Sequence, residues 1–214
     1  VLWSKRNPKE NSMQTLTLST VLGLALALPA AAHAADSYAI DTAHATAAFS
    51  VKHMMVTNVR GQFGKVTGTV VIDDKDLRKS KVNVEIDAAT IDTRHEKRDG
   101  HLRSPDFFNV AKFPKITFTS TKVAKAGKGK LKVTGDLTMR GVSKSVTLDV
   151  EGPTGEMKSP WGQKVRGVYA TTTINRKDWG LAWNKALEAG GLLVGEEVKI
   201  ILDIELLKPD PSKS

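Results

Sequence analysis

Apolar and polar residues alternate with a period of two along most of the chain, which is the pattern of β-strands that bury one face. The clearest run lies near the C-terminus, where the apolar positions are Val198, Ile200, Leu202, Ile204 and Leu206. Eight segments with this pattern are predicted to be strands: 49–53, 66–72, 82–87, 115–119, 131–139, 146–150, 168–174 and 198–206.

One apolar face per strand, opposite a polar face, indicates an antiparallel sheet. Short turns at 73–76, 126–129 and 139–143 allow neighbouring strands to pair as hairpins. We therefore predict a mainly β fold, an eight-stranded antiparallel up-and-down barrel, with a two-sheet sandwich as the alternative. The inward positions are mostly aliphatic and include Gly68 and Gly135, which we expect to leave room along the barrel axis for one small ligand.

Two long segments, 92–114 and 177–195, interrupt the alternation. The first has charged residues at helical spacing and then three phenylalanines, which predicts a short helical insertion and a Phe-rich return after the third strand. The second is a long loop before the last strand, with a short helical piece expected near 185–189. In an up-and-down meander both segments lie at the same rim, together with basic residues at positions 60, 94, 98, 103, 140, 176 and 177. An apolar bore with cations at its mouth suits an amphiphile with an acidic or polar head.

Residues 1–34 have the form of a secretory signal peptide. Lys5, Arg6 and Lys9 precede an apolar run that ends in small residues, with Ala32-His33-Ala34 as an A-x-A site. We expect cleavage after Ala34, export to the periplasm and a single domain over residues 35–214. The alternative is an uncleaved membrane anchor.

The exported part of the chain is basic and lacks cysteine. Without residues 1–34, 29 basic and 22 acidic residues remain, a net charge of +7. The dispersed positive charge suits peripheral contact with an anionic membrane or headgroup, whereas nucleic acid is not expected as a partner of an exported protein. Solubility alone is an equal explanation. Without disulfides, the fold must be stabilised by its own core.

The strongest candidate for chemistry is the sequence HEKRD at 95–99, which differs from the zinc-protease motif H-E-x-x-H in its last residue. His101 could add a third ligand, and the alternative is an exposed, charged helix face. His53 lies on an apolar strand face, where a hydrogen-bonded core histidine is the simpler interpretation. His44 is interpreted as a turn residue. We expect neither a metal nor a catalytic group.

Five ordered segments resemble the YceI-like family of periplasmic proteins: YAIDTAHATAAFSVKHMMVTNVRGQFG, HLRSPDFFNVAKFPKITFTS, GDLTMRGVSKSVTLDV, INRKDWGLAWN and LVGEEVKIILDIELLK. The resemblance runs from about Tyr38 to Lys208. It implies a lipocalin-like barrel with a hydrophobic tunnel that binds polyisoprenoids and other long-chain amphiphiles, with no cofactor, catalytic residue or metal.

We therefore predict a periplasmic carrier whose ligand is a polyisoprenoid or another long-chain lipid. The alternatives are a module that binds an envelope protein and, less favoured, a histidine-dependent hydrolase. The predicted ligand contacts are Phe49, Val51, His53, Phe63, Val84, Ile86, Arg98, Leu102, Phe107, Phe108, Phe118, Leu137, Met139, Trp179 and Trp183.

Overall fold

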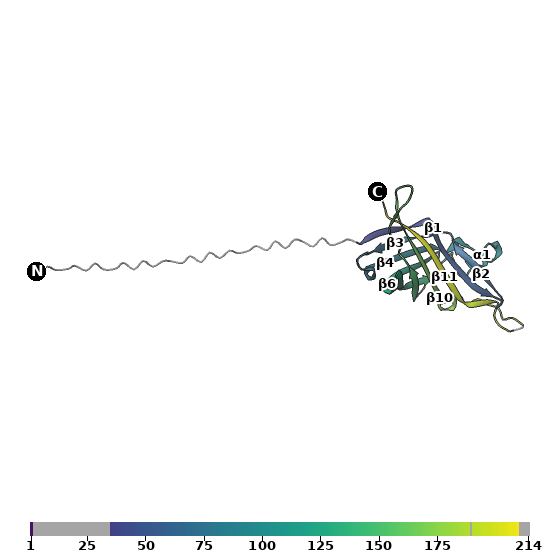
Figure 1. Cartoon of the computed structure of the whole chain (residues 1–214). Coiled ribbons are helices and arrows are strands. Elements are labelled where there is room, and N and C mark those ends of the chain that lie inside the picture. Colours follow the sequence, from purple (N-terminus) through teal and green to yellow (C-terminus); the bar gives the residue numbers. More distant parts are fainter. Residues whose placement is uncertain (2–34, 189, 210–214) are drawn as a thin grey trace. The chain divides into compact units, whose positions relative to one another are not determined.

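The computed structural model describes Val1, residues 35–188 and residues 190–209 (Figure 1). The predicted signal peptide lies outside the described residues except for Val1, so its cleavage stays a prediction. The strands are β1 Asp36–His53, β2 Thr57–Phe63, β3 Val66–Ile72, β4 Lys81–Asp87, β5 Ile91–Asp92, β6 Lys115–Gly127, β7 Lys130–Met139, β8 Val142–Glu151, β9 Met157–Lys158, β10 Lys164–Asn175 and β11 Val194–Leu207. The helices are α1 Glu96–Arg103 and the 3-10 turns η1 Leu77–Lys79, η2 Ala88–Thr90 and η3 Arg176–Trp179.

Eight of these strands form a closed antiparallel barrel. The order is β1, β3, β4, β6, β7, β8, β10 and β11, and β11 pairs back with β1 to close the sheet. Each of the eight predicted strands lies in one of these barrel strands, so the predicted barrel is confirmed and the sandwich is excluded. Within the described part of the chain, no helix is long and apolar enough to cross a bilayer.

The first strand is longer than predicted, and a strand was missed after it. Residues 36–39 of β1 pair with β3, whereas residues 47–53 pair with β2. The prediction treated residues 57–63 as a connection, because only Val59 and Phe63 are apolar there and the alternation is weak. Arg60, expected at the rim, instead lies within β2 opposite Ser50.

Residues 41–44, which precede the apolar half of β1, form a bulge in that strand. Ile40 pairs with Leu206 and Ala45 with Ile204, so residues 41–44 lie opposite the single residue Glu205. Such bulges increase the local twist of a strand. His44, expected in a turn before the strand, lies in this bulge.

The connections gather at two ends of the barrel. We call the end with residues 88–114, 140–141 and 176–193 the helix end, and the end with residues 73–80, 127–130 and 152–163 the turn end. The placement of both long segments at one end is as predicted. The short helix predicted after the third strand is α1, but no helix forms over residues 185–188, where Ala186 instead makes an isolated bridge to Leu192.

Gly68 and Gly135 do not widen the bore, contrary to the prediction. A Cβ at Gly68 would lie 2.1 Å from the Asn83 carbonyl oxygen, and one at Gly135 would lie 2.5 Å from the Thr119 oxygen and from the Phe118 ring. These glycines let neighbouring strands approach closely where the sheet coils. Their role is therefore in strand packing and not in making room for a ligand.

Replacing Gly135 by Ala is expected to lower the free energy of unfolding by about 1–3 kcal/mol, because backbone atoms of β6 block the added methyl group. Gly100 is the matched control: it lies inside α1, and a Cβ there would meet nothing within 4 Å. Gly100→Ala is expected to raise stability by about 0.5–1 kcal/mol. Urea denaturation of both variants tests this, and equal midpoints would contradict it.

Candidate functional site

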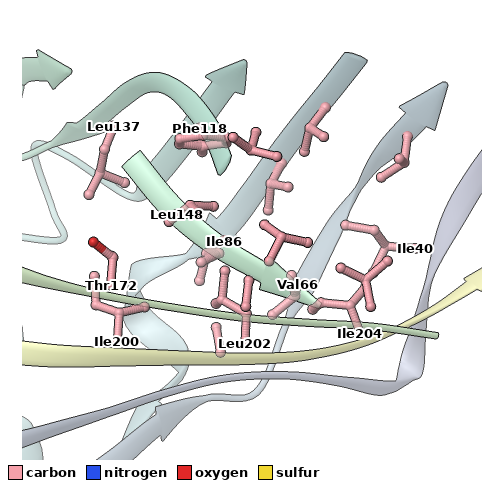
Figure 2. Close-up of a pocket in the computed structure, with 18 of the residues that line it drawn as sticks. Ile40, Val66, Ile86, Phe118, Leu137, Leu148, Thr172, Ile200, Leu202 and Ile204 are labelled. Atoms are coloured by element: carbon pink, nitrogen blue, oxygen red, sulfur yellow. The ribbon is translucent and has the colours of Figure 1, made fainter. Parts of the chain in front are cut away.

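The interior of the barrel contains a cavity of about 180 Å³. Figure 2 shows aliphatic side chains from opposite walls, among them Ile86, Leu148 and Leu202, directed into the same space. Along β7 its lining runs from Leu131 to Met139, which is about 26 Å of strand and roughly 20 Å along a tilted barrel axis. The cavity therefore has the length and narrowness that suit an extended chain.

The wall of the cavity is almost entirely hydrocarbon. Among its lining residues only Ser80 and Thr172 carry polar side chains. Both hydroxyls have partners in the sheet or turn: Ser80 Oγ accepts from the Asp73 amide at 3.2 Å, and Thr172 Oγ1 donates to the Thr147 carbonyl at 3.0 Å. No lining residue titrates. Such a surface removes apolar groups from water but offers no acid, base or nucleophile.

Seven of the predicted contact residues line the cavity: Phe49, Phe63, Val84, Ile86, Phe118, Leu137 and Met139. Eight do not: Val51, His53, Arg98, Leu102, Phe107, Phe108, Trp179 and Trp183. The cavity wall also includes residues of β1 before Phe49 and of the turn end that are absent from the predicted contacts, namely Ile40, Ala47, Ala48, Leu77, Ser80 and Pro153. Val51 and His53 lie in the part of β1 that pairs with β2, close to the β1–β2 turn.

An aromatic cap covers the helix end of the barrel. Trp179 at the end of η3 is 2% exposed, and its indole Nε1 donates to the Leu137 carbonyl at 2.9 Å. The ring of Trp183 lies 5.4 Å from that of Phe107 and 4.7 Å from that of His101, measured between centroids. The two long segments therefore meet each other over the barrel.

Phe107 and Phe108, which are adjacent in the return after α1, face different ways. Phe108 contacts Phe63 edge-on at 5.7 Å, and Phe63 lines the cavity. Phe107, predicted as a ligand contact, instead packs between His101 and Trp183. Of these two phenylalanines, Phe108 is thus the one whose ring contacts an aromatic residue of the cavity wall.

Arginines at the helix end bind backbone carbonyls. Arg176 is 5% exposed and donates to the carbonyls of Leu181, Val194 and Gly195. Burial lowers the pKa of Arg176. Arg140 joins the two long segments by donating to the carbonyls of Pro105 and Gly180. These bonds supply donors to carbonyls of the two long segments and of the start of β11.

Two further arginines at this end behave in the same way. Arg103 donates to the carbonyls of Ala89 and Ile91, both at 2.8 Å. Arg98 donates to Thr93 Oγ1 at 2.7 Å and to the Thr93 carbonyl at 2.9 Å. The sequence suggested free cations at the mouth of the barrel, but these four arginines are largely used to hold the loops there by hydrogen bonds.

The near-zinc motif does not converge on one point. His95 caps α1 by accepting from the Arg98 amide, while Asp99 is buried and accepts from the Thr93 amide and hydroxyl. His101 turns instead to Asp106, 2.9 Å away.

Across residues 35–188 and 190–209, one group could present three metal ligands: Asp41, His44 and Glu205, at the β1 bulge. His44 Nδ1 lies 2.7 Å from Asp41, and this contact raises the pKa of His44 and lowers that of Asp41. The cluster is on the outside of the barrel and away from the cavity lining.

The turn end is closed by a polar network. Arg166 makes two bonds to the Asp74 carboxylate, at 2.8 and 2.6 Å, and donates to the Tyr38 hydroxyl at 2.9 Å. Tyr38 is fully buried and donates to Glu156 at 2.8 Å. Burial, and then this bond, raise the pKa of Tyr38. The network joins the 73–80 turn to the loop after β8.

Solved structures share this fold. BcnA of Burkholderia cenocepacia superimposes with a TM-score of 0.67 at 23% identity, over 78% of this chain and 98% of that one. A YCEI protein of Campylobacter jejuni has a TM-score of 0.63 at 30% identity, over 74% of this chain and 90% of its own. A polyisoprenoid binding domain from Saccharophagus degradans has a TM-score of 0.58 at 18% identity, over 80% and 98% of the two chains.

Sequence relatives cover most of the barrel. The UPF0312 protein of Vibrio parahaemolyticus is 42% identical over 171 residues, which are 79% of this chain and 89% of the relative. A UPF0312 protein of Staphylococcus aureus is 40% identical over 164 residues, or 76% and 92% of the two chains. The model of the YceI-like domain matches residues 38–206, from the first barrel strand into the last. The chain therefore belongs to the YceI-like family.

Proposed function

We propose that this protein is a periplasmic carrier that holds the tail of a polyisoprenoid, or of another long-chain amphiphilic lipid, inside its barrel. The observation that carries the proposal is the long cavity, whose wall contains two paired hydroxyls and otherwise only apolar side chains. The fold shared with a protein described as a polyisoprenoid binding domain supports the same ligand class.

The affinity would come from removing the tail from water. Each buried CH₂ group contributes about 0.8 kcal/mol, so ten such groups contribute about 8 kcal/mol before the entropic penalties of association. A net value of about 8 kcal/mol corresponds to a dissociation constant of about 1 μM. About fifteen buried groups reach it when association costs about 4 kcal/mol. Tail burial therefore suffices without a strong polar contact.

The headgroup has a smaller role than the sequence suggested. Arg98, Arg103, Arg140 and Arg176 already donate to the protein, so pairing with a ligand would break bonds that hold the cap. The dispersed positive charge instead suits contact with the anionic membrane from which such a lipid is taken. We do not propose an enzyme, because the cavity wall offers no group that could act in catalysis.

Filling the cavity tests the proposal directly. Ala170 is 3% exposed and lines the cavity, so Ala170→Phe should place a ring where the tail would lie. Thr173→Phe is the matched control, because Thr173 lies on the same strand, exposed on its outer face. Organic extraction and mass spectrometry of protein purified from its own periplasm should find lipid in the wild type and in Thr173→Phe, and less than a tenth as much in Ala170→Phe. A full lipid content in Ala170→Phe would contradict the proposal.

The two cap phenylalanines should differ in effect. Phe107→Ala is expected to lower stability by about 3–5 kcal/mol, because the ring is 6% exposed and packed between two other rings. Phe108→Ala should lose less stability, because that ring is only partly buried, but it should release bound lipid faster through its contact with Phe63. Thermal unfolding and transfer of a fluorescent isoprenoid to vesicles measure the two effects. If the same variant showed the larger effect both on thermal unfolding and on lipid release, these separate roles of the two rings would be contradicted.

Export is tested by N-terminal sequencing of the periplasmic protein, which is expected to begin at Ala35. Recovery of protein with residues 16–32 intact from the membrane fraction would overturn both the cleavage site and the location.

A further inference from the structure

The turn between β1 and β2 exposes three consecutive apolar side chains. Met54, Met55 and Val56 are 46%, 59% and 81% exposed. Single exposed apolar residues are ordinary, but a contiguous group of them indicates a contact with another molecule or a membrane. We call residues 54–56 the apolar tip. Figure 1 shows β1, β2 and β11 extending together on the side of the molecule where this turn lies.

The backbone of the tip is unfavourable for the residues that occupy it. Met54 and Met55 have φ angles of 50° and 61°, in the left-handed region that glycine and asparagine adopt with least strain. Two-residue and three-residue hairpin turns favour those polar or small residues for the same reason. Methionine is here both strained and exposed, so folding of the barrel gives no reason for its presence.

The tip is held in place from the helix end. The Met54 amide donates to the Leu193 carbonyl at 2.8 Å. A Cβ at Gly191 would lie 3.4 Å from the Met55 Cγ, so the second long segment passes directly beside the tip. The exposed side chains are therefore presented by a supported turn and not by a free loop.

The surface behind the tip is basic. Arg60, Ser50 and Lys199 form one cross-strand row on the outer face, and Lys52 follows on the same face nearer the tip. In the part of the chain that the structure describes, none of these three cations lies within 4.0 Å of a carboxylate. The acidic residues on this face of β11 are Glu197, Asp203 and Glu205, and Glu197 is the one nearest the tip. The neighbouring loop contributes Lys185 and Glu188, and Asp92 of β5 lies opposite Gln62 of β2. The β1–β2 hairpin itself, residues 47–63, carries Lys52 and Arg60 and no acidic residue.

We propose that the apolar tip inserts into the surface of an anionic bilayer, with Lys52, Arg60 and Lys199 against the lipid headgroups. An apolar group with basic neighbours is the pattern by which proteins bind anionic membrane surfaces. A second copy of the chain fits less well, because a two-fold contact through this surface would bring the same cations together. The inference rests on the proposed function, since a lipid carrier must reach the membrane that holds its ligand.

The test is co-sedimentation with vesicles, using protein that begins at Ala35. All strands and α1 lie within residues 36–207, so this protein contains the complete barrel, whereas the apolar run at 16–34 would bind lipid by itself. Vesicles of 30% phosphatidylglycerol in phosphatidylcholine are compared with pure phosphatidylcholine. We expect binding to the anionic vesicles that weakens at least tenfold between low and high salt.

The decisive variant is Met54→Asn with Met55→Gly. These residues suit the left-handed backbone, so the variant should unfold at the same temperature as the wild type or higher, yet lose at least tenfold in vesicle binding. Trp161→Ser is the control, because Trp161 is 82% exposed in the loop between β9 and β10, at the turn end. Its vesicle binding should equal that of the wild type. The double variant Lys52→Gln with Arg60→Gln should weaken binding to the anionic vesicles and leave binding to pure phosphatidylcholine vesicles unchanged.

Each outcome separates this inference from the proposed function, because the vesicles contain no isoprenoid. Unchanged vesicle binding by the tip variant, binding lost only in Trp161→Ser, or a tip-dependent dimer in sedimentation would overturn the membrane contact. Lipid extracted with the purified protein is measured separately. If it is absent while the tip still binds vesicles, the carrier proposal fails and the membrane contact stands.

Discussion

The pairing of β1 with β11 is the interaction on which the rest of the structure depends. It runs from Ala39 opposite Leu207 to His53 opposite Val194 and turns an open sheet into a closed barrel. Without it, both strands would present unpaired amides and carbonyls along an edge. Closure also encloses every inward side chain, so the alternation of the strands becomes a continuous hydrocarbon wall. The cavity is a consequence of this closure and of the small side chains that line it, such as Ala47 and Ala170.

Closing the ends of the barrel poses a different problem, because the segments that cover them leave the sheet. Their carbonyls need donors, and arginine side chains supply these at the helix end. No buried side-chain nitrogen or oxygen in the described residues lacks a partner. At the turn end Arg166 similarly connects separate segments by donating to Asp74 and Tyr38. The arginines described at the two ends of the barrel therefore belong to its closures, whereas Lys52, Arg60 and Lys199 lie on the outer face of β1, β2 and β11.

The period-two pattern was sufficient to predict all eight barrel strands, because one face of each is buried and the other solvated. It failed at β2, where glycine and polar residues occupy most positions, and it could not show that Gly68 and Gly135 allow close strand contacts. The aromatic cap could be predicted from its position in the meander and its composition. The hydrogen bonds of Arg98 and Arg176 could not be predicted, because the sequence does not distinguish an arginine that donates to a backbone carbonyl from one that binds an anionic ligand. The exposure and left-handed φ angles of the tip methionines could not be predicted either, because the alternation pattern does not specify the backbone conformation of a turn.

The cavity links ligand binding to the stability of the barrel. At about 24 cal/mol per Å³, a cavity of 180 Å³ corresponds to roughly 4 kcal/mol of packing that the empty protein forgoes. A hydrocarbon chain that fills it restores those contacts, since its atoms replace empty space against the wall. A ligand that binds only the folded barrel would add its binding free energy to folding stability. Under the proposed function, the same aliphatic wall that lowers the packing of the empty barrel is the surface that a lipid tail would fill.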